Sequence, residues 1–174
     1  ILHISDLHLK EEGMAQDLIL DSLRNKIKSL SDTEYKFNFL VISGDLSFSG
    51  KSSQYTVVTD FITDILNHTG LISEQLILVP GNHDVDRSKI EAPEIGWYYS
   101  FSEKGNDWEK EKALNDTLES KSAFPRLMEK LEAYHQFEVD LKNTIQYGRY
   151  HEHVEKHQIN EKNSLVFVGL NSAL

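Results

Sequence analysis

The sequence predicts an α/β protein that begins with a strand–helix–strand–helix–strand (βαβαβ) unit. Residues 1–4, 37–42 and 76–79 are short apolar stretches, typical of strands buried in a parallel sheet. The two segments between them carry apolar residues at three- and four-residue spacing, which is typical of amphipathic helices. Each apolar stretch also runs directly into residues that can bind a metal ion. Right-handed crossovers would place both helices against the sheet.

The first predicted helix covers residues 17–30, and its apolar stripe consists of Leu20, Leu23, Ile27 and Leu30. The second begins at Ser52 or Ser53, either of which can serve as its N-cap, and ends near Gly70. Its stripe consists of Tyr55, Val58, Phe61, Ile62, Ile65 and Leu66. An apolar stretch at residues 165–170 predicts a further strand near the end of the chain.

Residues 86–160 no longer alternate between apolar strands and amphipathic helices, and we interpret them as a helical and loop insertion over the active-site edge of the sheet. The insertion belongs to one domain that comprises residues 1–174. Helical patterns cover residues 108–118 and 124–141, and the second has a core stripe of Leu127, Leu131 and Tyr134. Residues 106–119 carry charges of both signs and predict a solvated helix face. The aromatic stretch 97–101 either packs its own segment down, which we favour, or stacks a base or lines a substrate entrance.

Three histidines share one face of a strand predicted at residues 150–159. His151, His153 and His157 have the same parity in an alternating pattern, so one side of the strand would carry all three. Such a face either binds zinc or is a solvent-facing strand side that carries histidines. We favour the second interpretation, because no carboxylate or fourth ligand is spaced to complete a zinc site.

Composition limits the classes of function. The 174 residues, 39% of them hydrophobic, suit one domain with its own core. We expect a soluble, cytoplasmic protein without a membrane partner, since no apolar run has membrane length and no leader precedes the first strand. The absence of cysteine excludes disulfides and thiolate metal sites. The net charge of −10 argues against a broad surface that binds nucleic acid, although it does not exclude a local basic groove.

Candidate metal ligands follow each of the three early strands. Asp6 and His8 are two residues apart, so both point to one side of an extended chain. Gly44 allows a sharp turn that aims Asp45 back across the sheet edge, where its two oxygens could bridge two ions. Asn82 follows the third strand and adds a neutral oxygen ligand.

His83 and Asp84 complete this set, with Asp84 able to orient the imidazole of His83 through its second ring nitrogen. Each residue alone has a simpler explanation as a turn or cap residue. Together they favour a metal site, because the carboxyl ends of parallel strands meet at one sheet edge and polar groups gathered there need a partner.

These motifs resemble a known family. Asp6-Leu7-His8, Gly44-Asp45 with Gly50, and Gly81-Asn82-His83-Asp84 are similar to the first three signatures of the calcineurin-like metallophosphoesterases. The resemblance implies a β-sandwich flanked by helices with a centre of two divalent ions, of which manganese, iron or zinc suit such ligands. By the same match, Asp6, His8 and Asp45 would hold the first ion, Asp45 would bridge, and Asn82 would hold the second.

The resemblance also implies a mechanism. A hydroxide that bridges the two ions would attack phosphorus in line. His83 would stabilise the transition state or protonate the departing oxygen, with Asp84 holding its tautomer.

The sequence departs from the family at two places. Phe48 and Ser49 stand where the protein phosphatase branch has an Asp-Arg pair, so a Ser/Thr protein phosphatase is not expected. The motifs look more like the bacterial cyclic-nucleotide phosphodiesterase and exonuclease-like branch. The late histidine ligands of the family, a lone His and a Gly-His-x-His, have no match before Leu174. We therefore expect the chain to be truncated, with these ligands in a further C-terminal segment or domain of the same protein.

We interpret the protein as a metal-dependent enzyme that hydrolyses a phosphodiester or phosphomonoester, with a nucleotide as the expected substrate. One alternative is a non-catalytic scaffold of the same fold that binds other proteins. It is disfavoured because every early ligand position is occupied. The other alternative is a DNA or RNA nuclease, which the acidic charge makes less favourable without excluding it.

Overall fold

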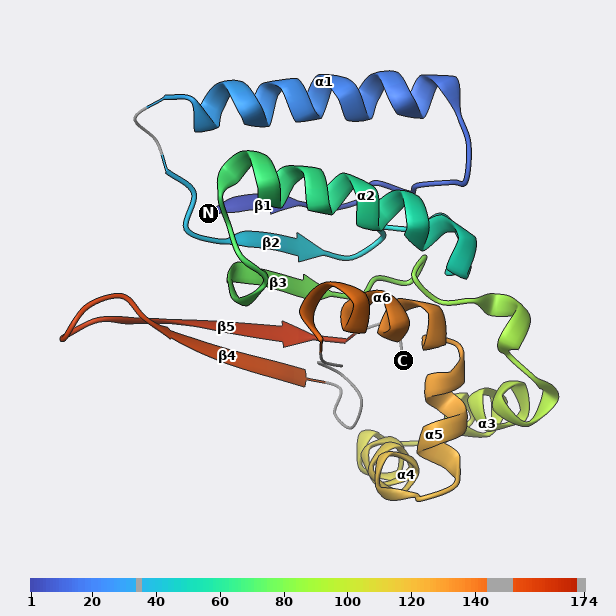
Figure 1. Cartoon of the computed structure of the whole chain (residues 1–174). Helices are drawn as coiled ribbons and strands as arrows, with labels where there is room; N and C mark the ends of the chain where they lie inside the picture. The colour runs from blue at the N-terminus through green and yellow to red at the C-terminus, as the bar shows by residue number, and fades with distance from the viewer. Residues whose placement is uncertain (34–35, 144–151, 172–174) are drawn as a thin grey trace.

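The computed structural model of the chain describes residues 1–33, 36–143 and 152–171. Its parallel sheet has three strands in the order β1 (Leu2–Ile4), β2 (Leu40–Ser43) and β3 (Leu76–Val79). Helix α1 (Met14–Ser31) connects β1 to β2, and α2 (Ser52–Thr69), followed by the short η1 (Ser73–Gln75), connects β2 to β3 (Figure 1). The predicted βαβαβ unit is therefore confirmed.

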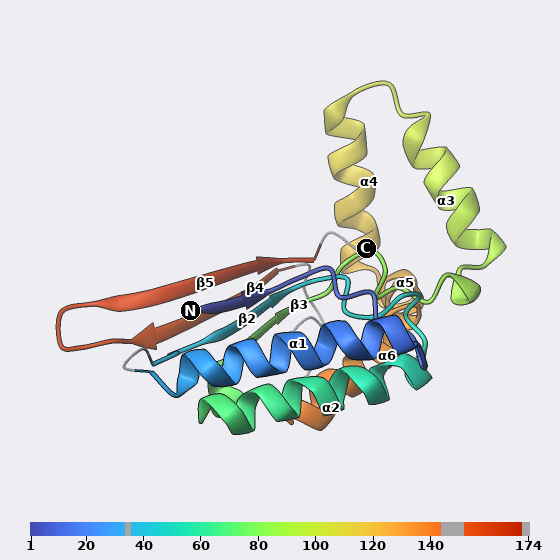
Figure 2. The same cartoon turned by 90° about the horizontal axis from the view of Figure 1, so that it is seen from above.

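Helices α1, α2 and α6 (Glu132–Lys142) lie along one face of the parallel sheet (Figure 2). The buried face of α2 contains five of the six residues of the predicted stripe, and the core also takes in strand residues and part of α1. The helix ends where predicted, since Gly70 adopts a left-handed conformation with φ 71°. The predicted N-cap is wrong. Lys51 occupies that position, and the Ser53 hydroxyl instead donates a hydrogen bond to Glu11 at 2.7 Å.

A series of helices follows β3: η2 (Arg87–Lys89), α3 (Ala92–Ser102), α4 (Asp107–Glu119), α5 (Ala123–Glu129) and α6. Helices α3 and α4 stand away from the sheet (Figure 2), and α4 has no buried residue, as its mixed charges predicted. None of the helices in the described part of the chain is long and apolar enough to cross a membrane.

The prediction of a single helix at residues 124–141 is wrong, because the helix is interrupted between α5 and α6. The Lys130 carbonyl accepts a hydrogen bond from the Asp86 amide at 2.8 Å, which diverts it from a helical bond. The predicted core stripe holds, since Leu131 and Tyr134 are fully buried and Leu127 is half-buried. Tyr134 lies 6.2 Å from the Tyr55 ring between centroids, so α6 belongs to the core beside α2.

Strands β4 (Glu152–Gln158) and β5 (Ser164–Leu170) form a separate antiparallel pair, on the side of the parallel sheet away from α1 and α2 (Figure 2). The rings of Phe167 and His157 pack on Phe39 with centroid distances of 5.0 and 4.7 Å. The strand predicted from the histidine pattern is thus confirmed over Glu152–Gln158. His157 is half-buried rather than solvent-facing, because it packs on these rings and hydrogen-bonds Glu155 at 3.1 Å. His151 and the side chain of His153 lie outside the described residues.

Beyond their strands, the loops that follow β1 and β2 continue side by side. The amides of Asp6 and His8 donate to the carbonyls of Gly44 and Asp45 at 3.1 and 2.9 Å. Leu9 then exchanges two backbone hydrogen bonds with the second loop, at 2.8 and 2.9 Å. This pairing holds the polar residues after β1 next to those after β2.

A buried carboxylate joins the loop after β3 to this pair. Asp84 is fully buried, and its oxygens accept hydrogen bonds from the amides of Leu46, Ser47 and Gly81 at 3.3, 3.0 and 2.9 Å. It also accepts from the Tyr55 hydroxyl of α2 at 2.9 Å. Burial raises the pKa of the Asp84 carboxyl, and these four hydrogen bonds act in the opposite direction. One side chain therefore links two loops and a helix.

We predict that Asp84→Asn lowers the free energy of unfolding by about 1–3 kcal/mol, the cost of leaving a buried donor unpaired. All four partners of Asp84 are donors, and an amide offers them one oxygen where the carboxylate offers two. Urea denaturation of the protein measures the change. Tyr55→Phe serves as the control, because it removes a single donor and keeps the ring. Tyr55→Phe should lower the free energy of unfolding by less than Asp84→Asn does. If Asp84→Asn unfolded with the wild-type free energy, the assigned contacts of Asp84 would be contradicted.

Candidate metal centre

Three side chains from three different loops meet at the carboxyl edge of the parallel sheet. His8 follows β1, Asp45 follows β2 and His83 follows β3. Each offers one potential ligand atom, and these atoms all lie within 4.8 Å of one another. The rings of His8 and His83 meet edge to face, with centroids 4.5 Å apart. The group contains two of the four ligands predicted from the sequence, together with the predicted catalytic histidine.

The backbone at this edge is strained. Asp6, His8 and Asp45 have φ angles of 58°, 47° and 55°, in the left-handed region that residues with side chains rarely adopt. Such strain costs of the order of 1–3 kcal/mol per residue and persists only where the surroundings impose it. Here the backbone hydrogen bonds between the first two loops impose it. Strained residues of this kind cluster at functional sites.

Two glycines allow the loops to approach each other. Gly44 has φ 89°, and a Cβ atom there would lie 2.8 Å from the Cα of Gly81. A Cβ atom on Gly81 would lie 2.2 Å from Oδ1 of Asp45. Neither position can take a side chain without moving a loop. The expected sharp turn at Gly44 is confirmed, and Gly81 is needed so that the Asp45 carboxylate can occupy its place.

His83 is held by two hydrogen bonds. Its amide donates to Oδ1 of Asp45 at 2.9 Å, and its Nδ1 lies 2.8 Å from the carbonyl oxygen of Phe48. Because a carbonyl can only accept, Nδ1 carries a hydrogen, and in the neutral tautomer the lone pair is therefore on Nε2. The expectation that Asp84 holds the tautomer of His83 is wrong. The Asp84 oxygens bind backbone amides and Tyr55, and the Phe48 carbonyl takes the role instead.

The residues present fit a divalent cation. Nδ1 of His8 is buried, and within the described ranges it has no hydrogen-bond partner. A buried polar atom without a partner is costly unless a ligand satisfies it. Asp45 uses Oδ1 to accept from His83, which leaves its other oxygen for an ion. Imidazole and carboxylate ligands together suit manganese, iron or zinc.

The other two predicted ligands lie on the same loops. The Asp6 side chain is exposed and does not belong to the group of His8, Asp45 and His83, although its amide binds Gly44 beside Asp45. Asn82 is also exposed and stands between Gly81 and His83. A role for Asp6 and Asn82 as ligands stays a prediction.

Two residues that support the site, Ser47 and Tyr55, are not predicted from the sequence pattern. Ser47 is fully buried; its hydroxyl donates to the His83 carbonyl at 3.1 Å and accepts from the Gly50 amide at 2.9 Å. Tyr55 was assigned only to the apolar stripe of α2. Its hydroxyl was the available signal, because a buried tyrosine hydroxyl usually has a hydrogen-bond partner. Burial and the nearby Asp84 raise the pKa of Tyr55 well above its ordinary value, so this hydroxyl is a donor.

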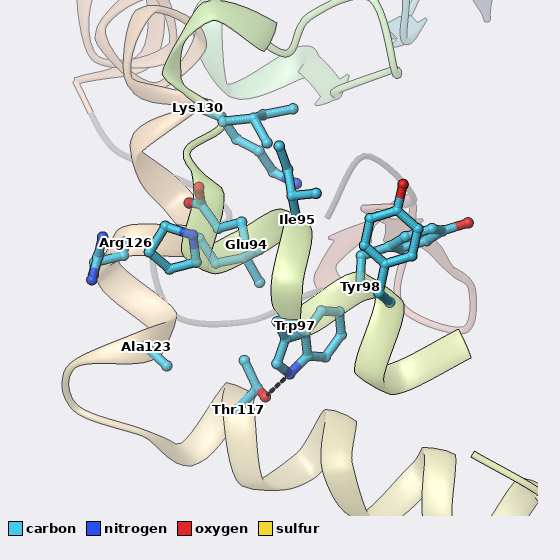
Figure 3. A pocket seen from close by; sticks show the side chains of 12 residues that line it. Glu94, Ile95, Trp97, Tyr98, Thr117, Ala123, Arg126 and Lys130 are labelled. Atoms are coloured by element: carbon cyan, nitrogen blue, oxygen red, sulfur yellow. Dashed lines mark hydrogen bonds between the residues drawn. The ribbon is translucent and has the colours of Figure 1, made fainter. Parts of the chain in front are cut away.

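The aromatic stretch lies on α3 and borders a pocket of about 430 Å³ between α3 and α5 (Figure 3). Trp97 packs the segment down, since it stacks on Phe101 with centroids 5.0 Å apart and donates to Thr117 at 2.9 Å. Tyr98 and Tyr99 are each 63% exposed and line the same pocket. The packing interpretation thus holds for Trp97, and an entrance role for the two tyrosines stays a prediction.

Comparisons with known proteins show the family of this chain. Residues 1–168 match the family described as calcineurin-like phosphoesterase. The chain is also similar to a protein of Bacillus subtilis (strain 168) described as the uncharacterized metallophosphoesterase-like protein YydB, with 34% identity over 86 residues. The aligned region is 49% of this chain and 18% of that protein, so the chain spans less than a fifth of its relative. The match covers nearly all of the chain, including every loop that carries His8, Asp45 and His83, and the chain belongs to the calcineurin-like phosphoesterase family.

Proposed function

We propose that the protein hydrolyses a phosphodiester or phosphomonoester, with a nucleotide as substrate, in a reaction that depends on two divalent ions such as manganese. The single observation that carries the proposal is the group of His8, Asp45 and His83 at the carboxyl edge of the parallel sheet. The buried, unpartnered Nδ1 of His8 within the described residues supports it. Membership of a phosphoesterase family supports the reaction class.

In this proposal Asp6, His8 and Asp45 would hold the first ion, and Asp45 and Asn82 would hold the second. When bound, divalent ions lower the pKa of a water molecule and stabilise the charge that develops on phosphoryl oxygens. Asp45 suits the bridging role because one of its oxygens is oriented by the His83 amide while the other is available. Asp84 is a positioning residue, which acts through the loops that carry Asp45 and His83.

His83 is proposed to act as the general acid that protonates the departing ester oxygen. Its Nδ1 is committed to the Phe48 carbonyl, so Nε2 is the atom that can take up and release a proton. The closeness of its ligand atom to those of His8 and Asp45 would also suit an alternative role, direct binding of an ion. The two roles differ in what removal of the imidazole does to bound metal.

Residues 86–160 are proposed to select the substrate as an insertion over the active-site edge. The support is that this region continues directly from the site, since Asp86 lies two residues after Asp84, and that the Asp86 amide donates to the Lys130 carbonyl at the end of α5. Substrate specificity commonly resides in such segments. A rigid sheet holds them in place, so their own sequence can vary with the substrate.

Asp45→Asn should abolish turnover of bis-p-nitrophenyl phosphate by the full-length protein in the presence of manganese. The amide lacks the negative charge of the carboxylate, and its NH2 group can neither accept from the His83 amide nor bind an ion. Turnover is measured by nitrophenolate absorbance and bound manganese by elemental analysis. Asp60→Asn is the matched control, because Asp60 is exposed on α2 and does not belong to the group of His8, Asp45 and His83. Wild-type turnover in Asp45→Asn would remove Asp45 from the centre.

His83→Ala should keep its metal content but lower the turnover rate by about 10²–10⁴-fold, the usual contribution of a general acid. Metal content separates the two roles. Removal of a proton donor leaves the ions bound, whereas removal of a ligand releases them. His68→Ala is the control, since His68 is exposed on α2. Manganese content is compared with turnover in the same preparations. Loss of manganese from His83→Ala would make His83 a ligand and overturn its assignment as the acid.

A further inference from the structure

A second cavity, of about 360 Å³, adjoins the candidate metal centre and shares His83 with it. One wall comes from the loop after β2 and the start of α2, with Phe48 and Lys51. The other comes from the segment that follows His83, with Arg87 and Ser88. A volume of this size is typical of small-molecule sites. A substrate whose phosphoryl group reached the centre would therefore have room for a further part of itself beside His83.

The cavity has basic side chains on both walls. Lys51 and Arg87 are exposed, and in the described part of the chain neither forms an ion pair. Lys51 is only the smallest of the influences that lower the pKa of Glu11, behind the hydrogen bond from Ser53. Unpaired cations are notable in a chain with a net charge of −10. They make the cavity a local exception to the acidic surface and favour an anionic occupant.

The acidic residue of the cavity is already engaged. The Asp86 carboxylate accepts from the amide and the hydroxyl of Ser88 at 3.0 and 2.6 Å, as the cap of η2. These bonds orient it toward the backbone of its own turn. Its charge offsets one of the two cations, so the cavity keeps an excess of positive charge.

Phe48 gives the cavity an aromatic lining residue whose backbone is held in place. Its ring is 44% exposed, yet its backbone is held at both ends. The amide donates to the Leu9 carbonyl at 2.9 Å, and the carbonyl accepts from His83. The Lys10 ammonium lies 4.1 Å from the ring centroid, which adds a third positive charge nearby. An exposed aromatic ring on a hydrogen-bonded backbone, beside cations, is the combination that stacks a base and binds a phosphate.

We infer that this cavity binds the part of the substrate beyond the scissile bond, and that this part carries a second phosphate. Lys51 and Arg87 would bind the phosphate, and Phe48 would stack the attached base. The inference rests on the proposed function and narrows its substrate to a linear dinucleotide with a terminal phosphate. In the reaction, a water oxygen bonds to the internal phosphorus, the ester bond to the departing nucleotide breaks, and its oxygen takes up a proton.

A pair of substrates that differ only in the terminal phosphate tests the inference. The dinucleotides pApA and ApA are compared with the full-length protein and manganese, and the readout is the ratio of their kcat/KM values. Any general loss of activity cancels in this ratio. We expect pApA to be preferred by about 10–100-fold, since each charge-assisted hydrogen bond to the phosphate contributes about tenfold.

Lys51→Ala and Arg87→Ala should each reduce this preference by about tenfold, and the double variant should nearly abolish it. Lys26→Ala is the matched control, because Lys26 is exposed on α1, and it should keep the wild-type ratio. Calorimetric titration with 5′-AMP, without metal, gives a readout independent of turnover. Its affinity should fall by a similar factor in the Lys51 and Arg87 variants and stay unchanged in the Lys26 variant.

The outcomes separate the inference from the proposed function. Cleavage of bis-p-nitrophenyl phosphate with equal kcat/KM for pApA and ApA would overturn the inference and leave the proposed function standing. A preference for pApA that both cavity variants retain would do the same. If the wild-type protein with manganese cleaves none of the three substrates, the proposed function fails and the inference fails with it.

Discussion

The buried carboxylate of Asp84 is the interaction on which the arrangement of the site depends. Three backbone amides from the loops after β2 and β3 point at it, together with the Tyr55 hydroxyl of α2. Burying a carboxylate is unfavourable unless donors surround it, and burying those donors is unfavourable without an acceptor. Each half of the arrangement therefore requires the other. The result fixes the loops that carry Asp45 and His83 relative to the helix behind them.

The strained backbone at the sheet edge is held by a second set of contacts, the backbone hydrogen bonds between the loops after β1 and β2. Asp6, His8 and Asp45 adopt left-handed conformations while their loops stay hydrogen-bonded to each other. The free-energy cost is offset by the paired amides and by the buried apolar residues beneath them, such as Leu9 and Leu46. The Phe48 carbonyl then orients His83, and Phe48 also lines the neighbouring cavity. One loop thus connects the candidate metal centre to the region that we propose binds the rest of the substrate.

Local pattern in the sequence was enough to predict the βαβαβ unit and the place where the site forms. The apolar stripe of α2, the left-handed Gly70 and the polar residues after each strand are all readable from short windows of sequence. The role of Asp84 was not, because three of its four partners lie 29 to 38 residues away and three of the four are backbone amides, which nearly every residue possesses. The break between α5 and α6 depends on a carbonyl used by distant Asp86, and the burial of His157 depends on Phe39. Such contacts arise only once the elements are packed.

The central claim is that His8 and Asp45 bind one divalent ion at the carboxyl edge of the parallel sheet. Crystals of the full-length protein grown with zinc, with diffraction recorded at the zinc absorption edge, test it most directly. The account predicts an anomalous peak about 2.0–2.2 Å from a ring nitrogen of His8 and an oxygen of Asp45. A zinc peak at His157 and Glu155 of the β4–β5 pair, with none between His8 and Asp45, would contradict it.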